Sequence, residues 1–167
     1  ALINNDINLI AYHLPLDAHP KYGNNAQLAE RLGIVTTGGL EPDNPYSVGN
    51  VGRLPAAIPV ESFCQLVAAT LGRKPLLVAG GDHKIETIGW CTGAAQGYID
   101  QAAALGVDAY LSGEISEPTV HSARELGVHY IAAGHHATER YGVQAVGEYL
   151  AKKFELDYQY IDVDSPA

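Results

Sequence analysis

Apolar and polar positions alternate in blocks along the chain, and the spacing within each block predicts its secondary structure. Residues 24–32 carry apolar side chains at helical spacing, with Asn24 or Asn25 available as a cap and Gly33 as a stop. An apolar run over 8–14, ended by a proline, predicts a strand before this helix. The chain is therefore expected to begin with a strand, a polar turn and a helix.

The middle of the chain is rich in residues that break helices. Between residues 36 and 59, glycine and proline recur too often for a helix, which predicts a loop-rich excursion with short edge strands. A helix over 60–71 follows, because apolar residues share one face, Pro59 suits its start and Gly72 suits its end.

From residue 75 onward, strand and helix patterns alternate with short turns between them. The expected strands cover 75–79, 85–91, 109–112, 129–133 and 156–163, and the expected helices cover 97–105, 118–126 and about 138–154. Such alternation implies right-handed crossovers between parallel strands. The predicted fold class is α/β, with a mostly parallel sheet and flanking helices.

Composition narrows the class of protein. The 167 residues are 47% hydrophobic and carry a net charge of -9, which suits a folded core and argues against a broad nucleic-acid-binding surface. DNA is therefore an unlikely partner. No apolar run is long enough to cross a bilayer and the first residues do not read as a secretory signal, so we expect no membrane span and a cytoplasmic location. Because the chain opens on Ala1 and holds no methionine, we expect an N-terminal part to precede it.

Two sequence segments carry residue types that bind cations. Asp17 follows the expected first strand, where it serves either as a ligand or as a turn or cap residue. His135 and Glu139 are four residues apart between a strand and the last helix, which places both on one helix face if the helix begins that early. An imidazole and a carboxylate in this arrangement commonly bind one metal ion, although a helix cap with a salt bridge explains them as well.

Other polar positions are weaker candidates. Glu114 follows the strand 109–112 and is expected near the same edge of the sheet, either at the site or in a turn. Thr92 and Gly93 open a turn of small residues whose backbone N–H groups suit an anion, with close packing as the alternative. Neither Cys64 nor Cys91 has a neighbouring signature of a nucleophile, a disulfide or a zinc site, so we expect both to be reduced and buried.

Two motifs carry a resemblance to a known family. The run HLPLD spans 13–17 and the run GHHATE spans 134–139. With the stretch IGWCTGAAQGYIDQAAALGVDAYLSGE between them, the chain resembles the dinuclear-metal proteins of the GTP cyclohydrolase 1 type 2, or NIF-three-like, family, above all the bacterial members once called radiation resistance proteins. The resemblance implies that family's two-lobed fold without its N-terminal part, with 37–95 as a loop-rich inner lobe and 1–36 plus 96–167 as a metal-binding lobe.

The resemblance also implies a ligand set. Asp17, His135 and Glu139 correspond to family ligands of two divalent ions, such as iron, zinc or manganese. His13 and His136 are then expected to orient ligands or touch substrate. The family's paired histidines from an N-terminal segment have no counterpart in this sequence.

Three functions follow from these expectations. The leading hypothesis is a metal-dependent hydrolase that activates water to attack a nucleotide-like or small cyclic substrate, in a homo-oligomer that the resemblance implies to be a hexameric ring. The first alternative is a metal-binding oligomeric scaffold without catalysis. The second is an inactive truncated lobe, since three ligands hold two cations poorly.

Overall fold

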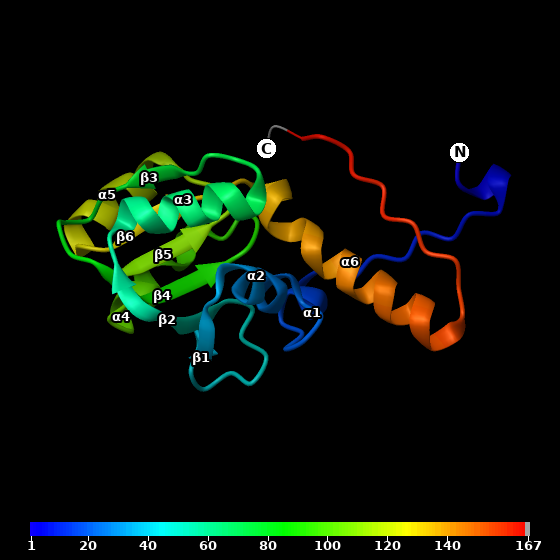
Figure 1. Cartoon of the computed structure of the whole chain (residues 1–167), viewed down its shortest axis with the longest axis horizontal. Coiled ribbons are helices and arrows are strands. Elements are labelled where there is room, and N and C mark those ends of the chain that lie inside the picture. The colour runs from blue at the N-terminus through cyan, green and yellow to red at the C-terminus, as the bar shows by residue number, and fades with distance from the viewer. Residues whose placement is uncertain (166–167) are drawn as a thin grey trace.

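The computed structural model describes residues 1–165 as one six-stranded sheet with helices on both faces (Figure 1). The strands are β1 (Val35–Gly39), β2 (Asn50–Ile58), β3 (Leu76–Val78), β4 (Ile85–Cys91), β5 (Ala109–Ser112) and β6 (His129–Ala132). The helices are α1 (Leu14–Asp17), α2 (Asn24–Leu32), α3 (Val60–Leu71), α4 (Ile99–Ala104), α5 (Glu117–Leu126) and α6 (His135–Phe154), with single 3-10 turns η1 (Ile3–Asn5) and η2 (Gln96–Tyr98). The predicted α/β class is confirmed.

The sheet has the strand order β1-β2-β4-β5-β6-β3, and its pairing corrects one expectation. Only β4 with β5 and β5 with β6 pair in parallel, whereas the other three pairings are antiparallel. The prediction of a mostly parallel sheet was therefore wrong. The physical reason is the connections: α4 and α5 provide the crossovers that parallel neighbours need, but no helix separates β1 from β2, which pair as an antiparallel hairpin.

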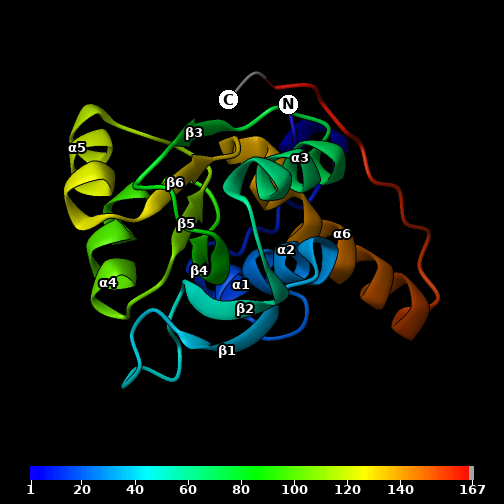
Figure 2. The same ribbon diagram turned by 60° about the vertical axis from the view of Figure 1, so that its left-hand side comes forward.

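Helices lie on both faces of the sheet (Figure 2), and apolar side chains between the helices and the sheet form two core clusters. On one face, residues of α2, α3 and the start of α6 pack against the sheet around the fully buried Phe63 and Trp90. On the other face, α4 and α5 enclose Tyr110 and Tyr130, which are also fully buried. A sheet protected on both faces gives the loops at its edge a rigid base.

The strand-to-helix turn after β6 is tighter than the sequence pattern suggested. Helix α6 begins at His135, three residues before the expected start at residue 138. Gly134 makes this possible because it adopts a φ of 98°, a backbone conformation that side chains with a Cβ rarely take. As a result His135 and Glu139 both lie in helix α6, on one face.

Two predicted strands are absent from the described residues. Segments 8–14 and 156–163 lack strand structure, and most of their large apolar side chains are exposed. An apolar run becomes a strand only when another strand supplies hydrogen-bond partners, and within residues 1–165 none lies alongside either segment. Their strand-like patterns are real features of the sequence, but this part of the chain does not provide the pairing.

The division into an inner lobe and a metal-binding lobe stays a prediction. Strands from 37–95 and strands from 96–165 share the one sheet. None of the helices in residues 1–165 combines the length and apolar character required to span a bilayer.

Candidate metal centre

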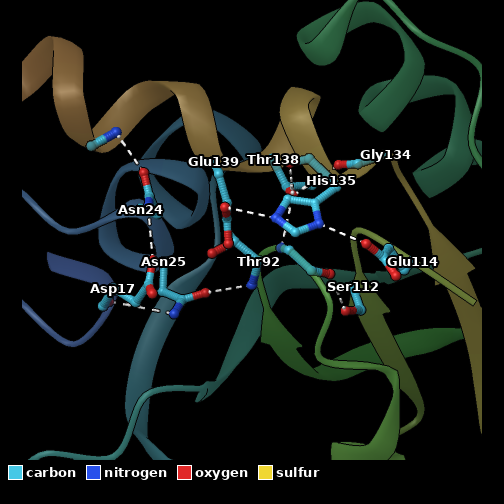
Figure 3. Close-up of polar contacts among 12 residues, drawn as sticks. Asp17, Asn24, Asn25, Thr92, Ser112, Glu114, Gly134, His135, Thr138 and Glu139 are labelled. Atoms are coloured by element: carbon cyan, nitrogen blue, oxygen red, sulfur yellow. Dashed lines mark hydrogen bonds and ion pairs between the residues drawn. The ribbon is translucent and has the colours of Figure 1, made fainter. Parts of the chain in front are cut away.

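The polar candidates gather at the carboxyl ends of the parallel strands β4, β5 and β6 (Figure 3). His135 and Glu139 come from the first turns of α6, Glu114 follows β5, and Asp17 ends the short helix α1. The residues are thus brought together from both ends of the chain, as the sequence predicted. Asp17 differs in one respect, since it is the last residue of a short helix and does not follow the expected strand.

His135 stands between two carboxylates. Its Nδ1 lies 2.7 Å from Glu114 Oε1, and its Nε2 lies 3.0 Å from Glu139 Oε2. The contact with Glu114 raises the pKa of His135, and Glu139 adds to this effect against the opposing effect of burial. A ring with both nitrogens facing carboxylate oxygens favours the protonated form of the imidazole, so positive charge is favoured between Nε2 and Glu139.

Asp17 and Glu139 are carboxylates in an environment that disfavours their charge. Burial raises the pKa of Asp17, although a hydrogen bond from Asn24 and the nearby His13 and His135 oppose it. Burial likewise raises the pKa of Glu139, and the negative charge of Asp17 raises it further. The two carboxylates therefore lie close enough to repel each other, which a cation between them would relieve.

Two buried asparagines position Asp17, and sequence reasoning assigned them a different role. Asn24 and Asn25 were expected to cap α2, but the N-cap is Gly23 and makes no side-chain cap. Asn24 Nδ2 instead donates to Asp17 Oδ1 at 2.7 Å, while its Oδ1 accepts from the N–H of Gly142 at 2.9 Å. Asn24 therefore ties the end of α1 to helix α6.

Asn25 connects the same region to β4. It is fully buried, its Oδ1 accepts from the N–H of Thr92 at 2.9 Å, and its backbone oxygen accepts from Trp90 Nε1 at 3.0 Å. Its Nδ2 donates to the backbone oxygen of Val48. The only sequence signal for this role was that two adjacent amide side chains open an otherwise ordinary helix.

Gly93 keeps the centre open. It has a φ of 70°, and a Cβ at this position would lie 2.0 Å from Glu139 Oε1 and 3.1 Å from His135 Nε2. Thr138 fixes this turn, since its hydroxyl accepts from the N–H of Gly93 at 3.1 Å and donates to the backbone oxygen of Gly134 at 2.9 Å. Any residue other than glycine at position 93 would place its side chain in the space in front of Glu139 and His135.

The same hydrogen bonds correct the predicted anion site. The N–H groups of Thr92 and Gly93 donate to Asn25 and Thr138, so neither is free to bind an anion. The turn is tight because its donors close the protein's own network. Thr92 Oγ1, by contrast, is buried and has no hydrogen-bond partner within residues 1–165.

His13 and His136 occupy different surroundings. His13 is exposed, but its charge lowers the pKa of both Asp17 and Glu139, so it lies near the carboxylates. His136 points to the C-terminal segment, where its Nε2 lies 3.3 Å from Asp162 Oδ1. The structure thus brings His13 to the carboxylates and gives His136 an acidic partner from elsewhere in the chain.

The donor set fits a divalent ion in part. Imidazole with carboxylates is a ligand combination for zinc, manganese or iron, and Glu114 on His135 Nδ1 matches the partner that a metal-bound histidine usually has. Within residues 1–165, however, no three His, Cys, Asp or Glu side chains are already arranged around one point. His135 and Glu139 form a pair of candidate ligands, with Asp17 close by.

The cysteines belong to the core and not to this chemistry. Both are free, and burial raises the pKa of the Cys91 thiol to about 12. A thiol of this kind is protonated at neutral pH and is a poor nucleophile. Cys64 is only partly buried, which differs from the expectation of full burial.

Comparison with known proteins gives consistent matches. A model of the Duf34/NIF3 (NGG1p interacting factor 3) family matches residues 1–166. A Pseudomonas aeruginosa protein named GTP cyclohydrolase 1 type 2 homolog is 60% identical over 166 residues, covering 99% of this chain and 66% of its own length. The Escherichia coli K12 protein of the same name is 50% identical over 167 residues, with 99% and 66% covered.

A solved structure agrees with these relatives. A chain described as protein ybgI, of unknown function, superposes with a TM-score of 0.92 at 49% identity and covers 98% of this chain and 65% of its own. The chain therefore spans slightly less than two thirds of the length of the relatives and of the solved protein that it matches.

Proposed function

Since this chain belongs to the Duf34/NIF3 family, we propose that it is the metal-binding part of a dinuclear metal-dependent hydrolase that acts on a nucleotide-like or other small cyclic substrate. The observation that carries the proposal is the placement of His135, with Glu114 behind one ring nitrogen and Glu139 before the other. A divalent ion can replace the proton that lies between His135 Nε2 and Glu139, because both groups favour positive charge there.

Each residue has a stated part in this proposal. Bound divalent ions would supply Lewis-acid activation of water and substrate. His135 and Glu139 hold them, with Asp17 as the third ligand held in place by Asn24. Glu114 fixes the tautomer and orientation of the His135 ring, as a carboxylate behind a ligand histidine does.

Proton handling falls to a histidine near the carboxylates. His13 is exposed to solvent and lies near enough to Asp17 and Glu139 to affect their charge, so it is placed to exchange a proton with the bulk. His136 is the weaker candidate, since Asp162 already engages it.

The names of the relatives suggest GTP as the first substrate to test. The experiment measures metal per chain by elemental analysis and turnover of GTP after loading with zinc, manganese or iron, in the wild type and in Asp17→Asn and His135→Ala. We expect both substitutions to reduce bound metal and to abolish any turnover. Asp100→Asn and His121→Ala serve as matched controls, because both residues are exposed and lie outside the centre.

The result separates the enzyme from the alternatives. If Asp17→Asn and His135→Ala bind as much metal as the wild type, the ligand assignment is wrong. Tight binding of metal with no turnover of any nucleotide supports a metal-binding scaffold instead. A wild type that binds no metal supports the inactive lobe.

We also propose that the protein works in the cytoplasm as a homo-oligomer, with a hexamer as the expected state. Large apolar side chains are exposed along the N-terminal segment, among them Ile7, Leu9, Ile10 and Tyr12. Such a surface is typical of protein contacts. Light scattering coupled to gel filtration tests this, and a monomer at micromolar concentration contradicts it.

A further inference from the structure

A cleft with charged residues in its lining lies next to the candidate metal centre. It has a volume of about 320 Å³ and includes His135 and Glu114, but neither Asp17 nor Glu139 lines it. Its other charged residues are Arg73 and Lys74. The cleft therefore borders the centre at His135. It also contains two positively charged side chains that have no role in the proposed hydrolysis.

The topology of the sheet places these cations there. Gly72 ends α3 with a φ of 71°, and the chain turns directly into β3, which pairs antiparallel with β6. Leu76 at the start of β3 lies opposite Ala132 at the end of β6. Arg73 and Lys74, which precede Pro75 and this strand, therefore lie near the point where α6 begins.

Arg73 lies directly over the turn that leads to His135. A Cβ built on Gly134 would meet Arg73 Nη1 at 2.8 Å and its Cζ at 3.1 Å. The guanidinium thus packs on the residue that precedes the candidate ligand. Glycine at this position serves two purposes, because it permits the turn and leaves room for the guanidinium.

Arg73 has no acceptor of its own in residues 1–165. Arg53 pairs with Glu86, and Arg140 pairs with Asp162 and with a backbone oxygen of α3. Arg124 on α5 also lacks an acceptor among the described residues, but it does not line the cleft, whereas Arg73 does. The carboxylate in the cleft, Glu114, is engaged by His135.

We propose that this cleft binds the phosphoryl group of the substrate, with Arg73 and Lys74 as its ligands. The inference rests on the proposed function, which puts the reacting atoms at His135 and Glu139. A guanidinium fork beside an ammonium group matches a tetrahedral oxyanion in shape and charge. The cleft is of a size for part of a small molecule, so the substrate class is a phosphorylated metabolite or nucleotide.

The test measures binding of inorganic phosphate by isothermal titration calorimetry to protein stripped of metal with EDTA. We expect measurable binding by the wild type, and weakening by about tenfold in each of Arg73→Gln and Lys74→Gln, since each loses a charged hydrogen-bond donor. Arg73→Lys keeps the charge but loses the guanidinium fork, so its affinity should lie between that of the wild type and that of Arg73→Gln.

The matched controls are Arg53→Gln and Lys84→Gln, which remove the same charges from exposed positions outside the cleft. We expect both control variants to bind phosphate with an affinity within about twofold of the wild type. The proposal is overturned if wild-type protein binds no phosphate, if Arg73→Gln binds it unchanged, or if the controls weaken it equally.

Metal content measured on the same samples keeps this inference separate from the proposed function. Zinc bound at the wild-type level in Arg73→Gln, together with weakened phosphate binding, supports both. Zinc binding with phosphate affinity insensitive to Arg73 overturns the cleft alone. If the wild type binds no zinc, the metal proposal is overturned. The phosphate titration in EDTA then remains a valid test of the cleft.

Discussion

Two clusters of polar groups lie at opposite ends of the parallel pair β4 and β5. The pKa of the carboxylate is lowered in one cluster and raised in the other. At the amino end, Asp108 Oδ2 accepts from the N–H of Glu86 at 2.9 Å and from the N–H and hydroxyl of Thr87, both at 2.7 Å. At the carboxyl end, Glu139 faces His135 and the negative charge of Asp17.

The pKa shifts follow from these surroundings. Burial raises the pKa of Asp108, but the hydrogen bonds from Thr87 and Glu86 outweigh it and lower the pKa. Burial also raises the pKa of Glu139, and there the donors do not outweigh it. A satisfied carboxylate supports the fold, whereas an incompletely satisfied one beside a second carboxylate is consistent with the proposed cation site.

The largest expected effect is at Glu139. Glu139→Gln should reduce zinc affinity by about a hundredfold, because it removes a charged ligand. The free energy of unfolding of the metal-free protein should not fall, since a raised pKa means that the ionised form destabilises the fold above the unfolded pKa. Zinc titration and urea unfolding at neutral pH measure the two effects, with the exposed Glu125→Gln as control. A large loss of stability without loss of zinc affinity would contradict the comparison.

The second effect is at Asp108 and has the opposite character. Asp108→Asn should lower the free energy of unfolding by about 2 kcal/mol at neutral pH, because charged hydrogen bonds are lost. Because the pKa of Asp108 is lowered in the folded state, its stabilisation is complete above the unfolded value of about 3.9 and disappears as the pH falls through the folded value. Urea unfolding from pH 6 to pH 2.5 should show the difference between wild type and variant shrinking with acid. A difference that stays constant with pH would count against it.

The third effect is at Glu114, behind His135. Glu114→Gln keeps a side chain of the same shape but weakens the partner of Nδ1, so zinc affinity should fall by about tenfold. Competition with a colorimetric chelator measures this. If the variant loses as much affinity as Glu139→Gln, Glu114 is itself a ligand and not the group that orients His135.

The smallest effect is on the exposed surface near Asp108. Arg53 and Glu86 form an ion pair at 3.2 Å with side chains that are 61% and 49% exposed. Arg53→Ala should therefore change the free energy of unfolding by less than about 0.5 kcal/mol. Thermal unfolding at low and high salt checks this, and a larger change would mean that Glu86 helps to hold the Asp108 cluster.

Part of the site could be read from residue spacing alone. His135 and Glu139 lie four residues apart on a helix face, so their approach needed only a helix to be predicted. The anion site predicted at Thr92 and Gly93 could not be judged from local sequence. Whether a backbone N–H is free depends on a partner elsewhere in the chain. Asn25 is that partner for Thr92, 67 residues earlier, and no local pattern joins the two.

The segments 8–14 and 156–163 show the same limit for the fold. Their apolar patterns resemble those of the confirmed strand 85–91, yet only the latter has neighbours on both sides. A helix satisfies its own backbone and so can be predicted from local sequence, as 24–32 and 60–71 were. A strand depends on what lies beside it.

The sequence by itself determined the α/β class, most helices and the four-residue spacing of His135 and Glu139, because these depend on periodicity within a few residues. Only the tertiary structure decided the direction of the strand pairs, the buried asparagines behind Asp17 and the position of Arg73 over Gly134. These features join residues distant in the chain, and their energies depend on burial, charge and hydrogen-bond partners that exist only after the chain has folded.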